Sequence, residues 1–488
     1  MSPCRNWWAG ARKLACPTLQ LLLLFAAAQP ARAAAPAPTV WEILPYRIQF
    51  MLVLAPEPEL TPALRQRIEA RVLERAERSV GSAWNLFIEP PPTELQAMAL
   101  APLRRLGIDD LPESLVESDF DKLLVAVVRL ADGGYEIEAR DYDLHARLAS
   151  SPVLRVAPQR ELLPDEVVEA VLLAFSPLAR IDDVEEKQVT LKLRAGALPP
   201  IDPSISFTQP GDVFRAVRRF NDREGKLKKL MNIDWTYLVV ERVDETDATC
   251  EMFSGLRSPL TGRSRGRDER LALLVRPTGG ATQLELHSRM LGDDPKTARP
   301  LAGYAIYAHP AGSPETVLVG RTNGDGKLLV PSDATPVRIL LVKHGGEPLA
   351  RLPIMPGLEP VMQAEVADDD VRLVAEGIIV GIQERLVDLI ARRQVTVVRI
   401  RARLEENKID EAKALLEELR LMGRQEDYIN EVRVQKQQAV SDDKRMQKKI
   451  DKLFDDTEQV IIRYLNTAEI EKLEREISAK EKELKGGK

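Results

Sequence analysis

The sequence predicts a multidomain α+β chain, in which a mixed α/β domain, a small β barrel and a β-sandwich precede a proline-free helical, coiled-coil C-terminus. All 34 prolines lie at or before Pro360, and the last 128 residues contain none. Proline breaks helix interiors, so this long stretch, rich in Leu, Glu, Lys and Arg, favours helices. Before Pro360, short apolar runs alternate with turn residues and a few segments of helical spacing, which predicts several strand-containing domains.

Residues 1–33 have the pattern of a secretory signal peptide. Basic residues open the chain, an apolar run follows from Leu19 to Ala28, and Ala31-Arg32-Ala33 has the small-x-small form that a signal peptidase requires. We therefore expect cleavage at Ala33 or Ala35 and a periplasmic or extracellular protein, with no membrane span in the mature chain.

Two other interpretations of this segment stay open. Leu14-Ala15-Cys16 resembles the end of a lipoprotein signal, but its apolar run follows the cysteine instead of preceding it. An uncleaved N-terminal membrane anchor is the other alternative, although the run is shorter than the about 20 apolar residues that a span needs.

Composition narrows the chemistry of the mature chain. Loss of residues 1–33 removes four bases and no acid, so the formal charge moves from −6 to −10. This mildly acidic balance predicts no nucleic-acid partner. Cys250 becomes the sole cysteine, which excludes an intrachain disulfide, and its alternating apolar surroundings predict a buried strand residue.

Residues 40–195 are predicted to form the mixed α/β domain. Strand-like runs lie at 46–54, 84–88, 122–130, 135–148 and 189–193, and helical spacing appears at 61–80, 93–106 and 164–178. This order suggests one mixed sheet with helices packed against it. A proline-rich linker, Leu198–Pro203, ends the domain.

Two β domains are predicted next. Residues 206–295 contain five short strand candidates separated by turns, which suggests a small barrel, and residues 299–360 contain five more, which suggests a sandwich.

Two family resemblances accompany these domains. Leu301–Tyr307, followed by Val319–Leu328 with its Thr322-Asn323-Gly324-Asp325-Gly326 turn, resembles the carboxypeptidase regulatory-like β-sandwich (about 299–360). That resemblance implies a structural module and no peptidase activity. Strand order and the segment Gln209–Phe214 resemble the TolB amino-terminal α/β domain followed by an SH3-like unit, as paired in flagellar assembly protein T (about 40–290). This second resemblance implies a fold and assigns no functional residue.

The proline-free region divides in two. Residues 368–440 are predicted to form helices that turn near Asn407-Lys408 and stop near Gly423. Residues 441–488 contain 12 acids and 12 bases around a broken heptad pattern, which suggests a coiled coil. Homo-oligomerisation or partner pairing through this helix, and docking of the helix on its own chain, are both consistent with that pattern. The expected seam comprises Met446, Ile450, Leu453, Val460, Ile470, Leu473, Ile477 and Leu484.

Motifs of catalysis and of metal or cofactor binding are absent from the sequence. The four histidines show no metal-ligand spacing, and no nucleophile elbow, P-loop or dinucleotide-binding glycine pattern occurs. We therefore expect no enzyme activity, no catalytic or metal-binding residue and no cofactor. His145 alternates with apolar residues in a predicted strand, which favours a structural role.

One cluster of charge predicts a binding site. Residues 201–295 balance 15 bases against 15 acids, so the local grouping is the signal and net charge is not. If the fold brings its two stretches together, bidentate contacts could hold an anionic envelope polymer or an acidic protein. A solvated loop and helix face is the alternative. The candidates are Arg215, Arg218, Arg219, Lys228, Lys229, Arg263, Arg265 and Arg267, accompanied by Arg223, Lys226 and Arg270.

The sequence therefore favours a non-enzymatic exported scaffold or adaptor that binds envelope components or protein partners. The alternatives are an envelope hydrolase with an unrecognised site in residues 40–195, and a solute-binding or sensing module.

Overall fold

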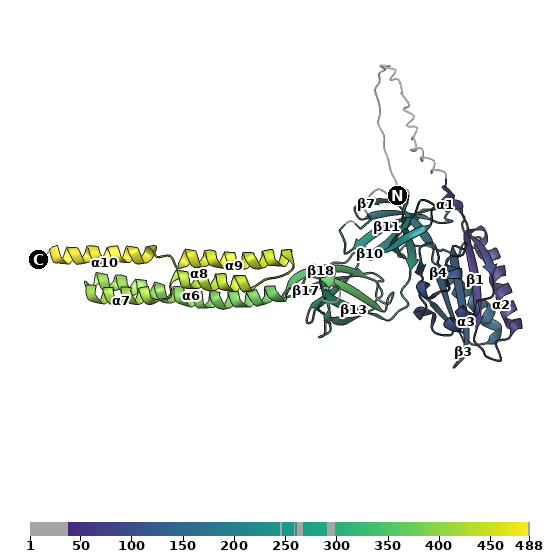
Figure 1. Cartoon of the computed structure of the whole chain (residues 1–488), viewed down its shortest axis with the longest axis horizontal. Coiled ribbons are helices and arrows are strands. Elements are labelled where there is room, and N and C mark those ends of the chain that lie inside the picture. Colours follow the sequence, from purple (N-terminus) through teal and green to yellow (C-terminus); the bar gives the residue numbers. More distant parts are fainter. Residues whose placement is uncertain (1–37, 245, 258, 261–266, 290–297, 487–488) are drawn as a thin grey trace, which may run out of the picture.

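The chain forms three β-containing units followed by a helical arm (Figure 1). The computed structural model describes residues 38–486 except 245, 258, 261–266 and 290–297, so the expected signal peptide lies outside the described residues. Within the described part, no helix is both long enough and apolar enough to cross a membrane. In Figure 1 the arm, residues 370–486, projects away from the β-containing units.

The first unit is a mixed α/β domain built on a six-stranded sheet. Strand β1 runs parallel to β2 and β3, whereas β4 runs antiparallel to β3, β5 and β6. The sheet order is β2 (Trp84–Ile88), β1 (Tyr46–Leu54), β3 (Lys122–Ala131), β4 (Gly134–Asp143) and β5 (Leu148–Ala149), with β6 (Val153–Ala157) also paired to β4.

Helices cover both faces of this sheet. On one face, Phe50 of β1 shares a core with residues of α2 (Pro62–Arg75) and α5 (Leu163–Ala174). On the other face, Met51 packs with Leu95 of α3 (Thr93–Ala99). The helix expected through Leu106 is shorter because Pro102 lacks an N–H and cannot continue the turn.

The second unit is a closed six-stranded barrel. It takes two strands from the stretch 40–195, because β7 pairs with β12 and β8 pairs with β11. Cys250 lies fully buried in the barrel core, as its surroundings predicted, and burial raises the pKa of its thiol to about 12. The barrel comprises β7 (Leu178–Glu185), β8 (Gln188–Leu193), β9 (Val213–Asn221), β10 (Leu227–Asp244), β11 (Asp247–Ser254) and β12 (Asp268–Val275).

The third unit packs a three-stranded sheet against a four-stranded sheet. Strand β13 (Ala281–Ser288), which the sequence placed in the small barrel, joins this unit because it pairs with β16 and β19. Leu284 and Leu286 of β13 share a core with Ile306 and Leu340 of the opposite sheet. The remaining strands are β14 (Ala305–Pro310), β15 (Val317–Arg321), β16 (Lys327–Pro331), β17 (Arg338–His344), β18 (Glu347–Ile354) and β19 (Val361–Val366).

The arm is built around one long helix. The predicted turn at Asn407-Lys408 is present, with Asn407 at φ 59°. Two apolar clusters follow each other along α6, one shared with α8 and α9 and the next shared with α7 and α10. The helices are α6 (Asp370–Glu405), α7 (Ile409–Leu421), α8 (Gln425–Gln438), α9 (Lys444–Tyr464) and α10 (Ala468–Gly486).

Residues 441–488 dock on their own chain in this structure. Ile450 of α9 packs in the cluster of α6 and α8, and Leu473 of α10 packs in the cluster of α6 and α7. The seam differs from the expected one: Val460 and Leu484 are exposed, while Phe454 and Ile461 are buried. Four of the eight expected seam residues, Met446, Ile450, Leu473 and Ile477, are therefore buried within the chain.

A buried ion pair within the first turn of α6 lies where the arm meets the sandwich. The Arg372 guanidinium donates to both carboxylate oxygens of Asp369, at 2.7 and 2.6 Å, and both side chains are almost fully buried. Arg372 also donates to the His344 carbonyl at 3.4 Å, and the Asp369 amide donates to the Tyr304 hydroxyl at 3.0 Å. The first turn of α6 is therefore bonded to His344 at the end of β17 and to Tyr304, which directly precedes β14. An exposed pair, Lys449–Glu347 at 2.8 Å, adds a second contact.

We expect Asp369→Ala to destabilise the sandwich and the arm together. Removal of Asp369 leaves the buried Arg372 guanidinium with Glu376 as its one remaining carboxylate, which costs up to about 3–5 kcal/mol. Glu347→Ala is the control, because loss of an exposed pair costs less than about 1 kcal/mol. Chemical denaturation of both variants measures the difference, and equal losses would contradict a special role for the buried pair.

Candidate functional site

The fold brings the two predicted basic stretches side by side. Strand β9 lies between β10 and β12, with Arg218 opposite Met231 on one side and opposite Arg270 on the other. The Asn221 amide donates to the Arg267 carbonyl at 2.8 Å, which places Arg267 next to the β9–β10 hairpin. Arg263 and Arg265 lie outside the described residues.

Three of the predicted binding residues are bonded inside the molecule. Arg215 pairs with Glu359 at 2.5 Å and with Asp234 at 3.1 Å. Arg218 pairs with Asp268. Arg219 donates to the Asn221 side chain at 2.9 Å and to the His145 carbonyl at 2.5 Å. These guanidinium groups hold strands together, so their capacity for an external anion is reduced.

Other members of the cluster remain on the surface. Lys228, Lys229 and Arg267 are exposed, as are Arg223 and Lys226 of the intervening turn. Within the described part of the chain, none of these five cations takes part in an ion pair. We call these five residues the basic hairpin tip.

The α/β unit and the barrel meet around a buried lysine that the sequence analysis missed. Lys122 opens β3, and its ammonium donates to Asp141 at 2.9 Å and to the Ser176 carbonyl at 2.7 Å, and lies 2.9 Å from an Asp143 oxygen. The rings of Tyr46 and Phe175 lie 5.5 and 5.2 Å from the ammonium. Lys122 is fully buried.

This arrangement joins two units through one short segment. Lys122 and Asp141 belong to the α/β sheet, whereas Ser176 precedes β7, the first strand of the barrel. The Tyr46 hydroxyl accepts from the Leu178 amide at 2.9 Å, and Arg276 of the barrel donates to the Phe175 carbonyl at 3.2 Å. We call the group Lys122, Asp141, Asp143 and Ser176 the buried lysine clamp.

In the clamp, two carboxylates share one ammonium, and burial acts together with these charges to shift the pKa values of Lys122 and Asp141. Burial alone would lower the pKa of Lys122, but the two carboxylates raise it. Burial raises the pKa of Asp141 to about 6, although Lys122 opposes the shift. Among the described residues, the Asp141 Oδ1 atom has no hydrogen-bond partner, so its ionised form is poorly stabilised.

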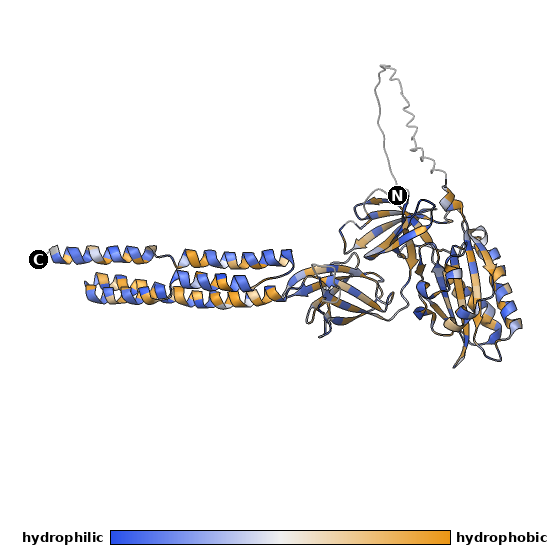
Figure 2. Cartoon of the chain, in the orientation of Figure 1, coloured by the Kyte–Doolittle hydropathy of each residue, from blue (hydrophilic) through white to orange (hydrophobic). Residues whose placement is uncertain are grey.

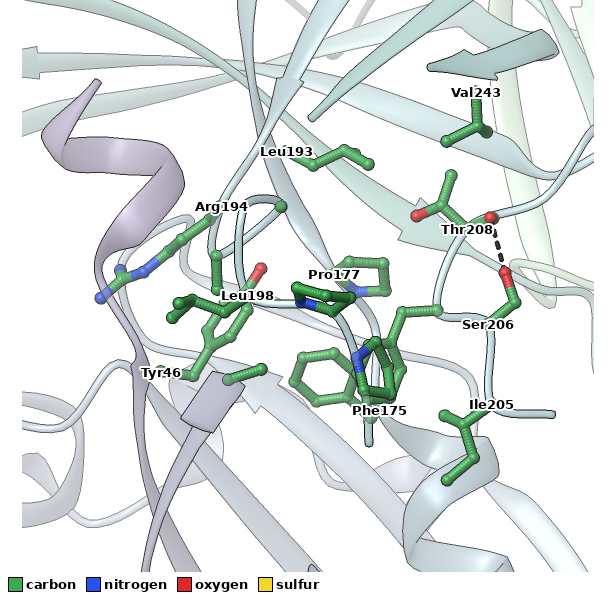
Figure 3. Close-up of a pocket in the computed structure, with 16 residues that line it drawn as sticks. Tyr46, Phe175, Pro177, Leu193, Arg194, Leu198, Ile205, Ser206, Thr208 and Val243 are labelled. Atoms are coloured by element: carbon green, nitrogen blue, oxygen red, sulfur yellow. Dashed lines mark hydrogen bonds between the residues drawn. The ribbon is translucent and has the colours of Figure 1, made fainter. Parts of the chain in front are cut away.

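A cavity of about 180 Å³ lies beside the clamp. Its walls are mostly apolar and include the linker residues Leu198, Pro199 and Pro200. Figure 3 shows Leu198 together with Tyr46, Phe175 and other lining residues. Phe207 packs against Trp84, with ring centroids 5.6 Å apart, and against Phe175 at 4.8 Å. The buried Thr208 hydroxyl has no partner in the described structure. Lys122, Asp141 and Asp143 do not line the cavity.

The cavity and the clamp carboxylates do not share a wall. A solute in the cavity would meet Tyr46, Phe175 and Arg194, and the clamp carboxylates lie outside the wall. The volume is comparable to an apolar cavity of about 150 Å³ that holds one benzene ring, and it is below the about 300 Å³ of small ligand pockets. No cluster of three or more His, Cys, Asp or Glu in the described ranges is arranged to hold a metal ion.

His145 lies in the turn between β4 and β5, so the prediction that it belongs to a strand is wrong. Its ring nitrogen lies 3.0 Å from Glu269 of β12, so it links the α/β unit to the barrel. The hydrogen bond with His145 lowers the pKa of Glu269, against the effect of burial.

Comparisons with known proteins leave the family unassigned. No protein-family model matches the chain, and no curated protein matches it. Among solved structures, GBS52, the minor pilin of Streptococcus agalactiae, aligns at 10% identity and a TM-score of 0.14, over 33% of this chain and 84% of the pilin. TolB from Acinetobacter baumannii aligns at 11% identity and a TM-score of 0.18, over 66% of this chain and 96% of TolB. Scores this low establish no shared fold over the aligned lengths.

We expect Lys122→Ala to lower the free energy of unfolding by about 3–5 kcal/mol, because two carboxylates would stay buried without their cation. Lys187→Ala, at an exposed turn of the barrel, serves as the control and should change stability by less than about 0.5 kcal/mol. Denaturant titration compares the variants. A loss at Lys122 no greater than at Lys187 would show that the clamp does not hold the two units.

We also expect Asp141 to make a specific contribution to the pH dependence of stability. Its pKa is about 6 in the folded chain and near 3.8 when unfolded, so its protonation favours the folded state fully below about pH 4. That contribution disappears as the pH rises through 6. The difference in unfolding free energy between wild type and Asp141→Asn should therefore move against the wild type from pH 4 to pH 6. Parallel pH profiles would contradict the raised pKa.

Proposed function

We propose that the chain is an exported, non-enzymatic scaffold that binds an anionic partner through the basic hairpin tip. The partner would be an acidic protein or an anionic polymer of the cell envelope. The helical arm would then hold this contact at a distance from the far end of the arm.

The observation that carries the proposal is the way the arm is attached. Helix α6 has 36 residues, about 54 Å at 1.5 Å per residue. Its first turn is bonded to the sandwich from Arg372 to the His344 carbonyl and from the Asp369 amide to the Tyr304 hydroxyl. A flexible linker between the β units and the helices would not keep a fixed spacing. A bonded joint does, which suits a protein that positions partners.

The basic hairpin tip supplies a plausible binding surface. Its five exposed cations lie on the start of β10, on the β9–β10 turn and directly before β12, so they present charge to one region of solvent. Such exposed charges contribute mainly to association rate and selectivity, and salt screens them. The surface of this acidic chain would therefore repel anions over much of its area, whereas the basic hairpin tip would attract them.

The two alternative functions receive less support. An envelope hydrolase in residues 40–195 would need reactive groups that a substrate can reach, and the buried lysine clamp is sealed behind Tyr46 and Phe175. A solute-binding module would need a larger cavity than the one beside the clamp. That cavity suits the side chain of a bound peptide better than a whole solute.

We expect Lys228→Ala/Lys229→Ala to weaken retention of the full chain on immobilised polyglutamate roughly two- to thirty-fold, from two exposed charge contacts of about 0.2–1 kcal/mol each. The salt concentration at half elution measures the effect. Arg67→Ala/Lys187→Ala is the matched control, because it removes two exposed cations elsewhere. If both double variants elute equally early, net charge is responsible and the basic hairpin tip is not the site.

A further inference from the structure

Helix α6 carries an exposed apolar stripe along the side that faces away from the other arm helices. Val380, Val387, Val395 and Val398 are 52–65% exposed. Gly377, Ala391 and Ala402, which are also exposed, fall between or beside them. Apolar residues recur along the whole helix in Figure 2. We call the four valines the valine stripe.

The periodicity of the helix separates this stripe from the packed face. At 100° per residue, Ile379, Ile382, Leu386 and Ile400 gather on one side, where they are buried against the other arm helices. The valine stripe lies on the opposite side. Its members recur at intervals of seven, eight and three residues, close to the heptad spacing of a helix that packs against another helix.

Among the residues that the structure describes, no segment of the chain covers the valine stripe. The seam of residues 441–488, from which the sequence suggested self-association, is mostly used inside the arm. The stripe therefore is the surface of the long helix that remains for pairing.

The charges of α6 indicate what could cover the stripe. From Asp370 to Asp388 the helix has four acids and two bases, and both bases, Arg372 and Arg385, are already paired with acids. From Ala391 to Arg403 it has five arginines and no acid. Arg401 and Arg403 are already paired with acids of the same chain, which leaves Arg392, Arg393 and Arg399 for a partner. One half of the helix is thus complementary in charge to the other half.

We propose that two copies of this chain associate through antiparallel pairing of their α6 helices along the valine stripe. Centred between Val387 and Ala391, the pair places Val380 opposite Val398 and Val387 opposite Ala391 of the second copy. Glu384 then faces Gln394, and Asp388 lies near Arg392. Valine suits the close packing of two helices, since its β-branched side chain fits two-stranded seams.

The length of the helix agrees with this register. With this centre, Glu405 of one copy comes level with Leu373 of the other, so almost all of α6 takes part. A parallel pair would instead set Glu384 against its own copy and the arginines of the second half against themselves. Electrostatic repulsion thus selects the antiparallel arrangement.

Sedimentation of the full mature chain tests the association. We expect a dimer whose dissociation constant rises at least tenfold in Val387→Glu/Val398→Glu, since both positions are exposed in the monomer and buried in the pair. Val374→Glu is the control, because Val374 is equally exposed on another side of α6. Circular dichroism confirms that each variant stays helical. A wild-type chain that remains monomeric at about 100 μM, or equal weakening by the control, would overturn the proposal.

Cross-linking tests the orientation. Val380→Cys and Val398→Cys chains, mixed, should form a disulfide-linked dimer on oxidation, whereas each alone should not, because like positions lie about 27 Å apart along an antiparallel pair. Buried Cys250 is common to all samples. Efficient cross-linking of either variant by itself would show a parallel pair and overturn the assignment.

A charge swap tests the register. Asp388→Arg should weaken the dimer, and Asp388→Arg/Arg392→Asp should restore it; no restoration would also contradict the register.

Discussion

A charge buried where two units meet must find its partner there, and this constraint sets the shape of the molecule. Lys122 lies in the α/β sheet but is bonded to the segment that leads into the barrel. Arg372 lies in the arm but is bonded to the edge of the sandwich. Both cations keep their carboxylates within one unit, so the bond that crosses between units is the one to the Ser176 carbonyl or to the His344 carbonyl. If the units rotated apart, each buried cation would lose that carbonyl acceptor, and a buried donor left without its acceptor costs about 1–3 kcal/mol. Apolar contacts alone would let the units slide against each other, because such contacts have no preferred direction.

The sequence predicted the class of most elements but not their sheets. Absence of proline located the arm, and alternation located most strands. A strand does not reveal its neighbours, however, because pairing partners lie far along the chain. Strands β8 and β13 were expected in different units for this reason: β8 pairs with β11 more than fifty residues later, and β13 pairs in parallel with β19. Strand β7 was not predicted, since a helix was expected up to residue 178. Only the three-dimensional pairing assigns them.

The candidate sites show the same division between local and distant information. The Asp132-Gly133 turn fixes the β3–β4 register and thereby sets Lys122 opposite Asp143, so part of the clamp could have been found from sequence. The Ser176 carbonyl and the covering aromatic rings could not. In the basic cluster, acids supplied by residues 234 and 359 neutralise Arg215. Counting charges within one stretch cannot reveal that distant residues neutralise some of them. The sequence alone therefore could not distinguish the exposed cations of the cluster from the internally paired ones.

The two proposals together have a geometric consequence. The amino-terminal end of α6 leads from the sandwich, so an antiparallel pair carries the β-containing units of its two copies at opposite ends. Two basic hairpin tips would then be held apart by a rigid span instead of a flexible tether. A long anionic polymer can bridge such a span, and its second contact forms at the effective concentration set by that fixed distance. A compact acidic protein can occupy only one tip, so the paired arm favours extended partners over small ones.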